Sequence, residues 1–204
     1  MLPLARKPVT RRIPRQDDPM PKAWVDKEIY QVIRRGGDDA IALALDAKIG
    51  LNTQLVMVNN GREGTLSALA SNPAIAPKIQ TALFNSIVHE VRYALAANPR
   101  LCKPIQRHIV GNADSRLLEI LAGNPGAIPE IQWEIIAKII DDMRAGNDAM
   151  PILIAFAGNP GIDLQIQFKL ARIIAASNNE DAASAFASNP GIGLAAKALI
   201  SKRE

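Results

Sequence analysis

The dipeptide Asn-Pro recurs five times in one setting, and this recurrence constrains the fold more than any other feature of the chain. In each case a large apolar residue lies three positions before the asparagine and an alanine lies two positions before it. The five asparagines are Asn72, Asn98, Asn124, Asn159 and Asn189, separated by 26, 26, 35 and 30 residues. Such self-similarity indicates a repeat architecture, in which each unit buries its apolar face against its neighbours.

Each unit is predicted to contain two short helices joined at Asn-Pro. The residue before a proline is disfavoured in the α region, so the first helix ends near the asparagine. Apolar residues seven and eleven positions after the asparagine form an i, i+4 pair on one face of a second helix. These pairs are Ile79/Leu83, Ile105/Ile109, Ile131/Ile135, Ile166/Leu170 and Ala196/Ile200. The pattern therefore predicts an all-α fold, a right-handed α-solenoid of five to six short helix-turn-helix repeats.

The first and last units depart from this pattern. Residues 41 to 56 fit the same frame with Lys48 at the asparagine position and Leu45 three positions before it. At the other end, Ala196 and Lys197 replace the Ile-Gln pair of the four preceding units. End repeats are expected to deviate because one of their faces meets solvent instead of a neighbour. Both segments are therefore predicted to be caps.

The units resemble leucine-rich repeat variant repeats, over about residues 41 to 200. The matching strings include VRYALAANPRLCKPIQRHI (91–109) and LLEILAGNPGAIPEIQWEI (117–135). The resemblance implies a curved solenoid of alternating short, partly 3₁₀, and α-helices, and it implies no particular activity. Two features differ from the family: the single cysteine, Cys102, cannot supply an iron-sulfur cluster of the kind found in its best-described member, and the units here are longer. Longer units are similar to HEAT-type helix pairs.

The net charge of +4 resides entirely in residues 1–22. This segment is also rich in proline, which removes backbone donors and disfavours helix before it. The sequence therefore predicts a basic, flexible tail at 1–22 and a single helical-repeat domain at 23–204. The candidate basic arm consists of Arg6, Lys7, Arg11, Arg12 and Arg15. A solvated linker, a nucleic-acid-binding arm and a targeting segment remain alternative interpretations of this tail.

No membrane segment, secretory signal or catalytic motif is recognisable. The chain has no apolar run of 18 residues and no signal-type apolar stretch at its N-terminus, which favours a cytoplasmic location, with secretion by a route without a signal peptide as an alternative. The only histidines, His89 and His108, lie at unrelated positions of neighbouring units. We expect no cofactor, no metal and no enzymatic activity; the alternative is a helical-repeat enzyme similar to DNA-repair glycosylases.

Glutamine stands eight residues after four of the asparagines, as Gln80, Gln106, Gln132 and Gln167. These side chains form either a polar ladder that satisfies the turns of adjacent units or the lining of a binding groove. The asparagine side chains are expected to bond the local backbone, as asparagine does in turns. Both interpretations depend on which face of the stack each amide meets.

The unit between Asn124 and Asn159 is the longest, and residues 130–150 account for the excess. Its second helix is predicted to continue to Gly146. Insertions in repeat arrays tend to decorate one face, often the binding face, so Trp133 is a candidate partner-binding residue. Asp141, Asp142 and Asp148 form either an acidic rim of that face or a solvated helix end.

These observations favour a non-enzymatic scaffold or adaptor that binds another protein, because a helical stack presents an extended surface and its body is neutral. The alternative is nucleic-acid binding by the basic arm and a groove. No membrane partner is expected. The identity of the partner and the oligomeric state are not determined by the sequence.

The invariant alanine predicts close approach between units. Replacing Ala122 with leucine is expected to lower the free energy of unfolding by about 1 to 3 kcal/mol, because a larger side chain would overpack this contact. Thermal or denaturant unfolding measures the effect, and an unchanged melting temperature would contradict the assigned repeat frame.

Overall fold

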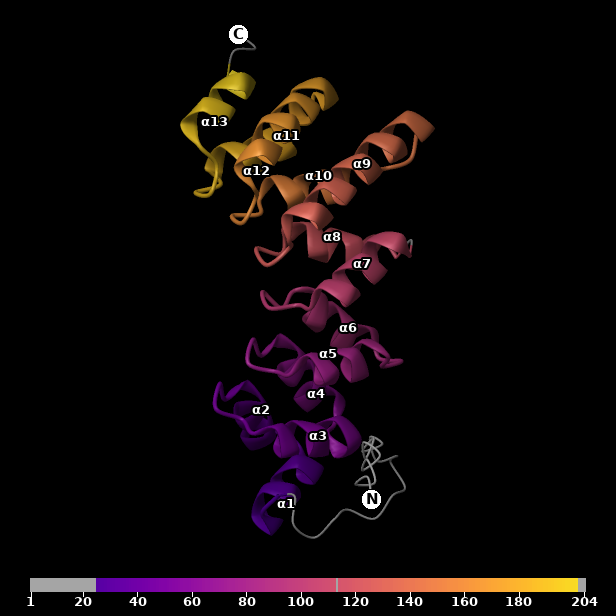
Figure 1. Ribbon diagram of the computed structural model, residues 1–204, viewed down its shortest axis with the longest axis vertical. Coiled ribbons are helices and arrows are strands. Elements are labelled where there is room, and N and C mark those ends of the chain that lie inside the picture. The colour runs from indigo at the N-terminus through magenta and orange to yellow at the C-terminus, as the bar shows by residue number, and fades with distance from the viewer. Residues whose placement is uncertain (1–24, 113, 202–204) are drawn as a thin grey trace, which may run out of the picture.

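A computed structural model describes residues 25–112 and 114–201, which form 13 α-helices and no strand (Figure 1). The helices are α1 (Lys27–Arg35), α2 (Asp38–Leu45), α3 (Leu51–Asn60), α4 (Glu63–Ser71), α5 (Pro77–Phe84), α6 (His89–Ala96), α7 (Lys103–Gly111), α8 (Ser115–Gly123), α9 (Pro129–Ala145), α10 (Met150–Ala157), α11 (Leu164–Ser177), α12 (Glu180–Ser188) and α13 (Leu194–Ser201). The predicted all-α class is confirmed.

From α2 onward the helices alternate between two layers. The even-numbered helices pack on one another in sequence, and the odd-numbered helices form the second layer beside them. The six helix pairs, α2–α3 to α12–α13, agree with the predicted solenoid of five to six repeats, and α1 packs against the first pair. Figure 1 shows an elongated stack in which the turns between paired helices line up along one edge.

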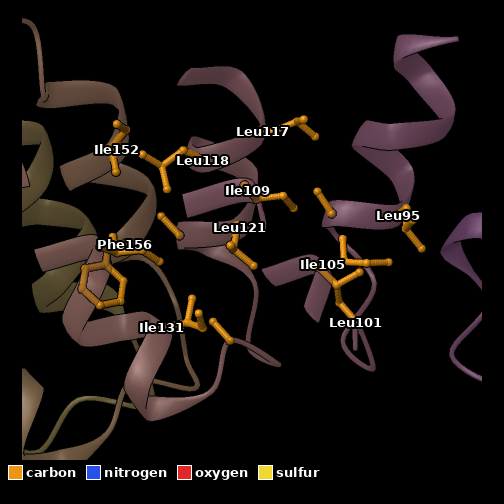
Figure 2. Packing of buried hydrophobic residues seen from close by; sticks show 14 of the residues in the cluster. Leu95, Leu101, Ile105, Ile109, Leu117, Leu118, Leu121, Ile131, Ile152 and Phe156 are labelled. Carbon is orange, nitrogen blue, oxygen red and sulfur yellow. The ribbon is translucent and has the colours of Figure 1, made fainter. Parts of the chain in front are cut away.

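The space between the layers is filled by the residues that define the repeat. The large apolar residue three positions before each anchor asparagine is fully buried, and so is the alanine that follows it in the four inner units. Figure 2 shows Leu121 and Phe156 of the even layer beside Ile131 of the odd layer. Burial of these side chains is the main source of stability, and the small alanine lets successive even helices approach closely.

Each anchor asparagine bonds both its own turn and the unit before it. Asn124 Oδ1 accepts from the Gly126 N–H at 2.7 Å, while Asn124 Nδ2 donates to the carbonyls of Ala96 at 2.7 Å and Asn98 at 2.8 Å. The other four asparagines make the same three bonds. The predicted local bond is confirmed, but it is only part of the interaction. The amide also satisfies a carbonyl at the C-terminus of the preceding even-numbered helix, and that carbonyl has no partner within its own helix.

The predicted frame of the first unit is wrong by two residues. Leu45 is 52% exposed, whereas Ala44 is fully buried. Asn72 Nδ2 donates to the carbonyls of Ala44 and Asp46, at 2.8 and 2.9 Å, which places Asp46 rather than Lys48 at the asparagine position. The first unit lacks the Asn-Pro dipeptide that sets the frame elsewhere, and its true spacing to Asn72 is the 26 residues of the next two units.

Asp46 shows how the first unit differs from the others. Its Oδ1 accepts from the Lys48 N–H at 2.8 Å, so the local half of the asparagine interaction is kept. A carboxylate has no N–H to donate, and no helix pair precedes this unit in the described residues. Aspartate therefore stands in place of asparagine in the unit that has, within the described structure, no preceding helix pair whose carbonyls could accept a bond from the side chain.

The structure bears differently on the predicted tail and on the expected lack of a membrane segment. The predicted tail, with Arg6, Lys7, Arg11, Arg12 and Arg15, lies outside them, so its role stays a prediction. Among the described helices, none combines the length and the apolar composition that a membrane crossing requires.

Asn124→Asp is expected to lower the free energy of unfolding by at least about 2 kcal/mol at neutral pH, because two buried carbonyls lose their donor and a charge is buried in its place. The matched control is Asp46→Asn, the reverse change at the end of the ladder, which is expected to alter stability by less than about 0.5 kcal/mol. Urea unfolding measures both. Equal effects would show that the bonds between units do not stabilise the stack.

Candidate partner-binding surface

The four candidate glutamines lie inside the stack. Gln106 Nε2 donates to the carbonyls of Leu101 at 2.8 Å and Gly126 at 3.0 Å, and its Oε1 accepts from the Ile128 N–H at 3.1 Å. Gln80, Gln132 and Gln167 bridge to the following unit in the same way and, like Gln106, are at most 5% exposed. These bonds form a polar ladder between units. Placement of the glutamines in a binding groove is therefore wrong, because the amides are buried and paired within the chain.

A fifth glutamine belongs to the same ladder and was not predicted. Gln54 Oε1 accepts from the Ala76 N–H at 3.0 Å, and Gln54 Nε2 donates to the Ile49 carbonyl at 3.0 Å. Gln54 lies eight residues after Asp46, so the error in the frame of the first unit concealed it. Its spacing of 26 residues from Gln80, equal to the spacing of the next two glutamines, was the available signal.

Trp133 lies on the second turn of α9 and is 42% exposed. Phe168 occupies the equivalent position in the next unit, nine residues after Asn159, and is 40% exposed. Leu164 and Leu194 occupy another shared position, five residues after their anchors on α11 and α13, and are more exposed still. We call Trp133, Leu164, Phe168 and Leu194 the apolar ridge.

The apolar ridge lies in the last three units, and the first unit repeats one of its positions with the exposed Leu51, five residues after Asp46. In the two units between, the same two positions hold Pro77 and Thr81, then Lys103 and Arg107. Lys103 Nζ lies 2.9 Å from Glu130 Oε1 on the neighbouring α9, and this hydrogen bond is the largest cause that lowers the pKa of Glu130. At these two positions the side chains of α5 and α7 are polar, basic or proline, whereas α9, α11 and α13 carry the four apolar residues of the ridge.

The second helices of the long units end in an apolar pocket. α9 has 17 residues and α11 has 14, whereas the remaining described helices have 8 to 10. The pocket lies between their C-terminal halves and is lined by Ile140, Met143, Arg144, Ile173 and Ala176. Ile140 follows Trp133 by seven residues, two helical turns along the same face of α9.

The acidic residues of the long unit belong to a solvated helix end. Asp141 and Asp142 lie 3.7 and 3.6 Å from bases of their own helix, Arg144 and Lys138. Asp148 accepts from the Met150 N–H at 3.0 Å at the start of α10. As predicted, α9 ends at Gly146, which adopts the left-handed conformation with a φ of 75°. The acids therefore do not form a separate rim.

The neutral body separates its charge between the two layers. Within the even helices the acidic residues are Asp38, Asp39, Glu63, Glu90, Glu119, Glu180 and Asp181, against the bases Arg92 and Arg116. Within the odd helices from α3 the bases are Lys78, Lys103, Arg107, Lys138, Arg144, Lys169, Arg172 and Lys197, against the acids Glu130, Glu134, Asp141 and Asp142. All the even-layer acids except Glu119 lie in first turns, where the helix dipole favours them. Among the odd-layer bases only Arg144 lies in a last turn, where the dipole favours a base.

The two histidines lie on different helices and make different contacts. His89 Nδ1 contacts Arg92 Nη2 at 2.8 Å on α6, and the His108 ring on α7 meets Phe84 edge to face at 5.2 Å. Within residues 25–112 and 114–201, no three potential metal-ligating side chains of His, Cys, Asp or Glu come together.

Comparison of the chain with models of protein families, with curated proteins and with solved structures gives no match. The class of protein is therefore defined by its own helices, which pack in sequential pairs as in a helical-repeat protein. The surface that distinguishes this stack is the apolar ridge with the adjoining pocket.

Trp133 provides a spectroscopic test of this surface. In the variant Trp24→Phe it is the sole tryptophan, and we expect red-shifted emission that acrylamide quenches, because 42% of the residue is exposed to water. The measurement is a steady-state fluorescence titration at several protein concentrations. Blue-shifted emission that resists quenching at every concentration would contradict the exposure of Trp133.

Proposed function

We propose that this protein is a non-enzymatic scaffold or adaptor that binds another protein through the apolar ridge. The observation that carries the proposal is the position of its exposed apolar residues. Of the eight large apolar side chains exposed in the described residues, five lie on α9, α11 and α13: Trp133, Leu164, Phe168, Leu194 and Leu199. Contiguous exposed apolar surface marks an interaction site, and aromatic residues are enriched in the energetic centres of such sites.

The construction of the stack supports a binding role. Two rows of buried amides connect successive units, so the odd helices are held at defined spacings and present their side chains in rows. Helical-repeat proteins use such extended surfaces to bind other macromolecules. A partner would meet a surface that needs little rearrangement, which reduces the entropic cost of association.

We further propose a relationship to leucine-rich repeat variant proteins. The Leu-Ala-x-Asn-Pro strings and the spacing of 26 residues in the first units support it, and the longer α9 and α11 make the later units more similar to HEAT-type pairs. This relationship carries no activity with it. A cytoplasmic location stays a prediction.

Nucleic-acid binding is the second candidate function, and one observation favours it. The only ionisable bases and acids on α5 and α7, apart from His108, are Lys78, Lys103 and Arg107, so this part of the odd layer is basic. The basic arm of the tail would add to it. However, Glu130 already neutralises Lys103, which leaves few charges for phosphate contacts.

The proposed function predicts that a protein captured from the native host's extract is lost when the ridge is altered. The double variant Trp133→Ser, Phe168→Ser is expected to lose it, because these side chains would form the apolar centre of the interface. Leu51→Ser is the matched control: Leu51 is also 40% exposed, but it lies on α3 in the first unit. Immobilised variants and mass spectrometry of the bound proteins provide the measurement.

The nucleic-acid alternative requires its own assay. Random duplex and single-stranded DNA are titrated at low salt with the wild-type chain and with the five bases of the arm replaced by glutamine. Binding that persists in the substituted chain and weakens steeply with salt would favour nucleic acid over protein as the partner. Capture that survives the ridge double variant but is lost with Leu51→Ser would also contradict the proposal.

A further inference from the structure

We propose that the surface between α9 and α11 binds an amphipathic helix of the partner, one whose apolar face is flanked by acidic side chains. The surface, here named the α9–α11 surface, consists of the pocket residues Ile140, Met143, Ile173 and Ala176 together with Trp133 and Phe168. This inference rests on the proposed protein-binding function and specifies the chemistry of the partner.

The spacing of the apolar residues fits a helix. Trp133 and Ile140 are seven residues apart on α9, about 10 Å along its axis, and Met143 follows one further turn away. A partner helix that lies along these helices would present residues at i, i+3 or i+4 and i+7 over the same distance. The pocket lining is apolar apart from Arg144, so its occupant is a large apolar side chain rather than a polar one.

The charges beside the pocket are positive. Lys169 and Arg172 lie four residues before Ile173 and Ala176 respectively, so both bases share the pocket side of α11. Neither forms an ion pair with any residue of the described structure. Arg144 completes the set at the pocket, and its contact with Asp141 at 3.7 Å joins two mostly exposed groups, which makes it weak.

The acids of α9 do not offset these bases. Glu130 is bonded to Lys103 of α7, and Glu134 follows it by four residues, so both lie toward α7 rather than α11. Asp142 is paired with Lys138 on its own helix. An apolar surface flanked by Arg144, Lys169 and Arg172 is complementary to an apolar helix face with acidic flanks, because opposite charges at the rim select the partner and its orientation.

The same charges disfavour two other occupants. A second copy docked through this surface about a two-fold axis would place basic flanks against basic flanks. A nucleic acid would find charge at the rim but no polar group in the pocket except Arg144. An anionic membrane shares the attraction to apolar and basic groups, and the experiment therefore includes it as an outcome.

The test is a selection with displayed peptides. A phage library of helical 15-residue peptides carries fixed leucines at i, i+4, i+7 and i+11, randomised flanks and no tryptophan, and is selected on the immobilised full chain. We expect enriched flanks rich in Asp and Glu. Synthetic copies are expected to bind Arg172→Glu about tenfold more weakly than wild type, and Met143→Glu more weakly again, as measured by fluorescence anisotropy.

Lys78→Glu is the matched control, because it makes the same charge change on α5, away from the surface. It is expected to leave peptide affinity unchanged. Circular dichroism melting shows whether each variant is folded, and in the Trp24→Phe background the Trp133 emission is expected to shift to the blue when a peptide binds. That shift reports occupancy of the surface without any substitution in it.

Vesicles of phosphatidylcholine and phosphatidylglycerol provide the membrane arm, and we expect the protein to remain unbound on sedimentation. The proposal is overturned by a selection that enriches no sequence, by enriched flanks without acidic residues, by equal effects of Arg172→Glu and Lys78→Glu, or by vesicle binding that Trp133→Ser abolishes. If host-protein capture depends on the ridge while these peptides fail, the scaffold function stands and the acidic helix does not.

Discussion

The side-chain amide is the interaction on which this stack depends. Each anchor asparagine fixes its own turn and bonds back to the unit before, and each ladder glutamine bonds forward to the unit after. An amide both donates and accepts, which a hydroxyl or a carboxylate cannot do with the same reach and geometry. Apolar burial supplies most of the stability, but it is nondirectional. The amides set the direction in which one unit follows another.

The amides also explain where the fold can vary. Asparagines and glutamines of the two rows both act at the turn edge, so the opposite ends of the helices carry no bond of these rows. α9 and α11 extend there by several residues beyond the other described second helices, and the pocket forms between the extensions. A new surface can thus be added to one unit without disturbing the bonds that align its neighbours.

The periodic part of the structure could be predicted from sequence, and its departures from periodicity could not. Asn-Pro and the i, i+4 pairs identify the helices because proline and helical spacing act locally. The first unit was placed two residues out of frame because it has no proline there, and Gln54 was missed with it. Phenylalanine is a residue type typical of the core, and Phe168 is exposed only because of its position on the helix. The net charge of the helical domain is zero, and this sum does not reveal that the even layer is acidic and the odd layer basic.

The two ends of the amide ladder bear on self-assembly. Stacked repeats resemble short lengths of a filament. A second copy placed end to end would continue the rows of asparagine and glutamine bonds only if its first unit and the last unit of the other copy could form those bonds. Asp46 would bring a carboxylate, not a donor, to the carbonyls of Ala187 and Asn189 of the other copy. Lys197, at the last glutamine position, has no acceptor for a following turn. The residues that end the ladder therefore also oppose its polymerisation.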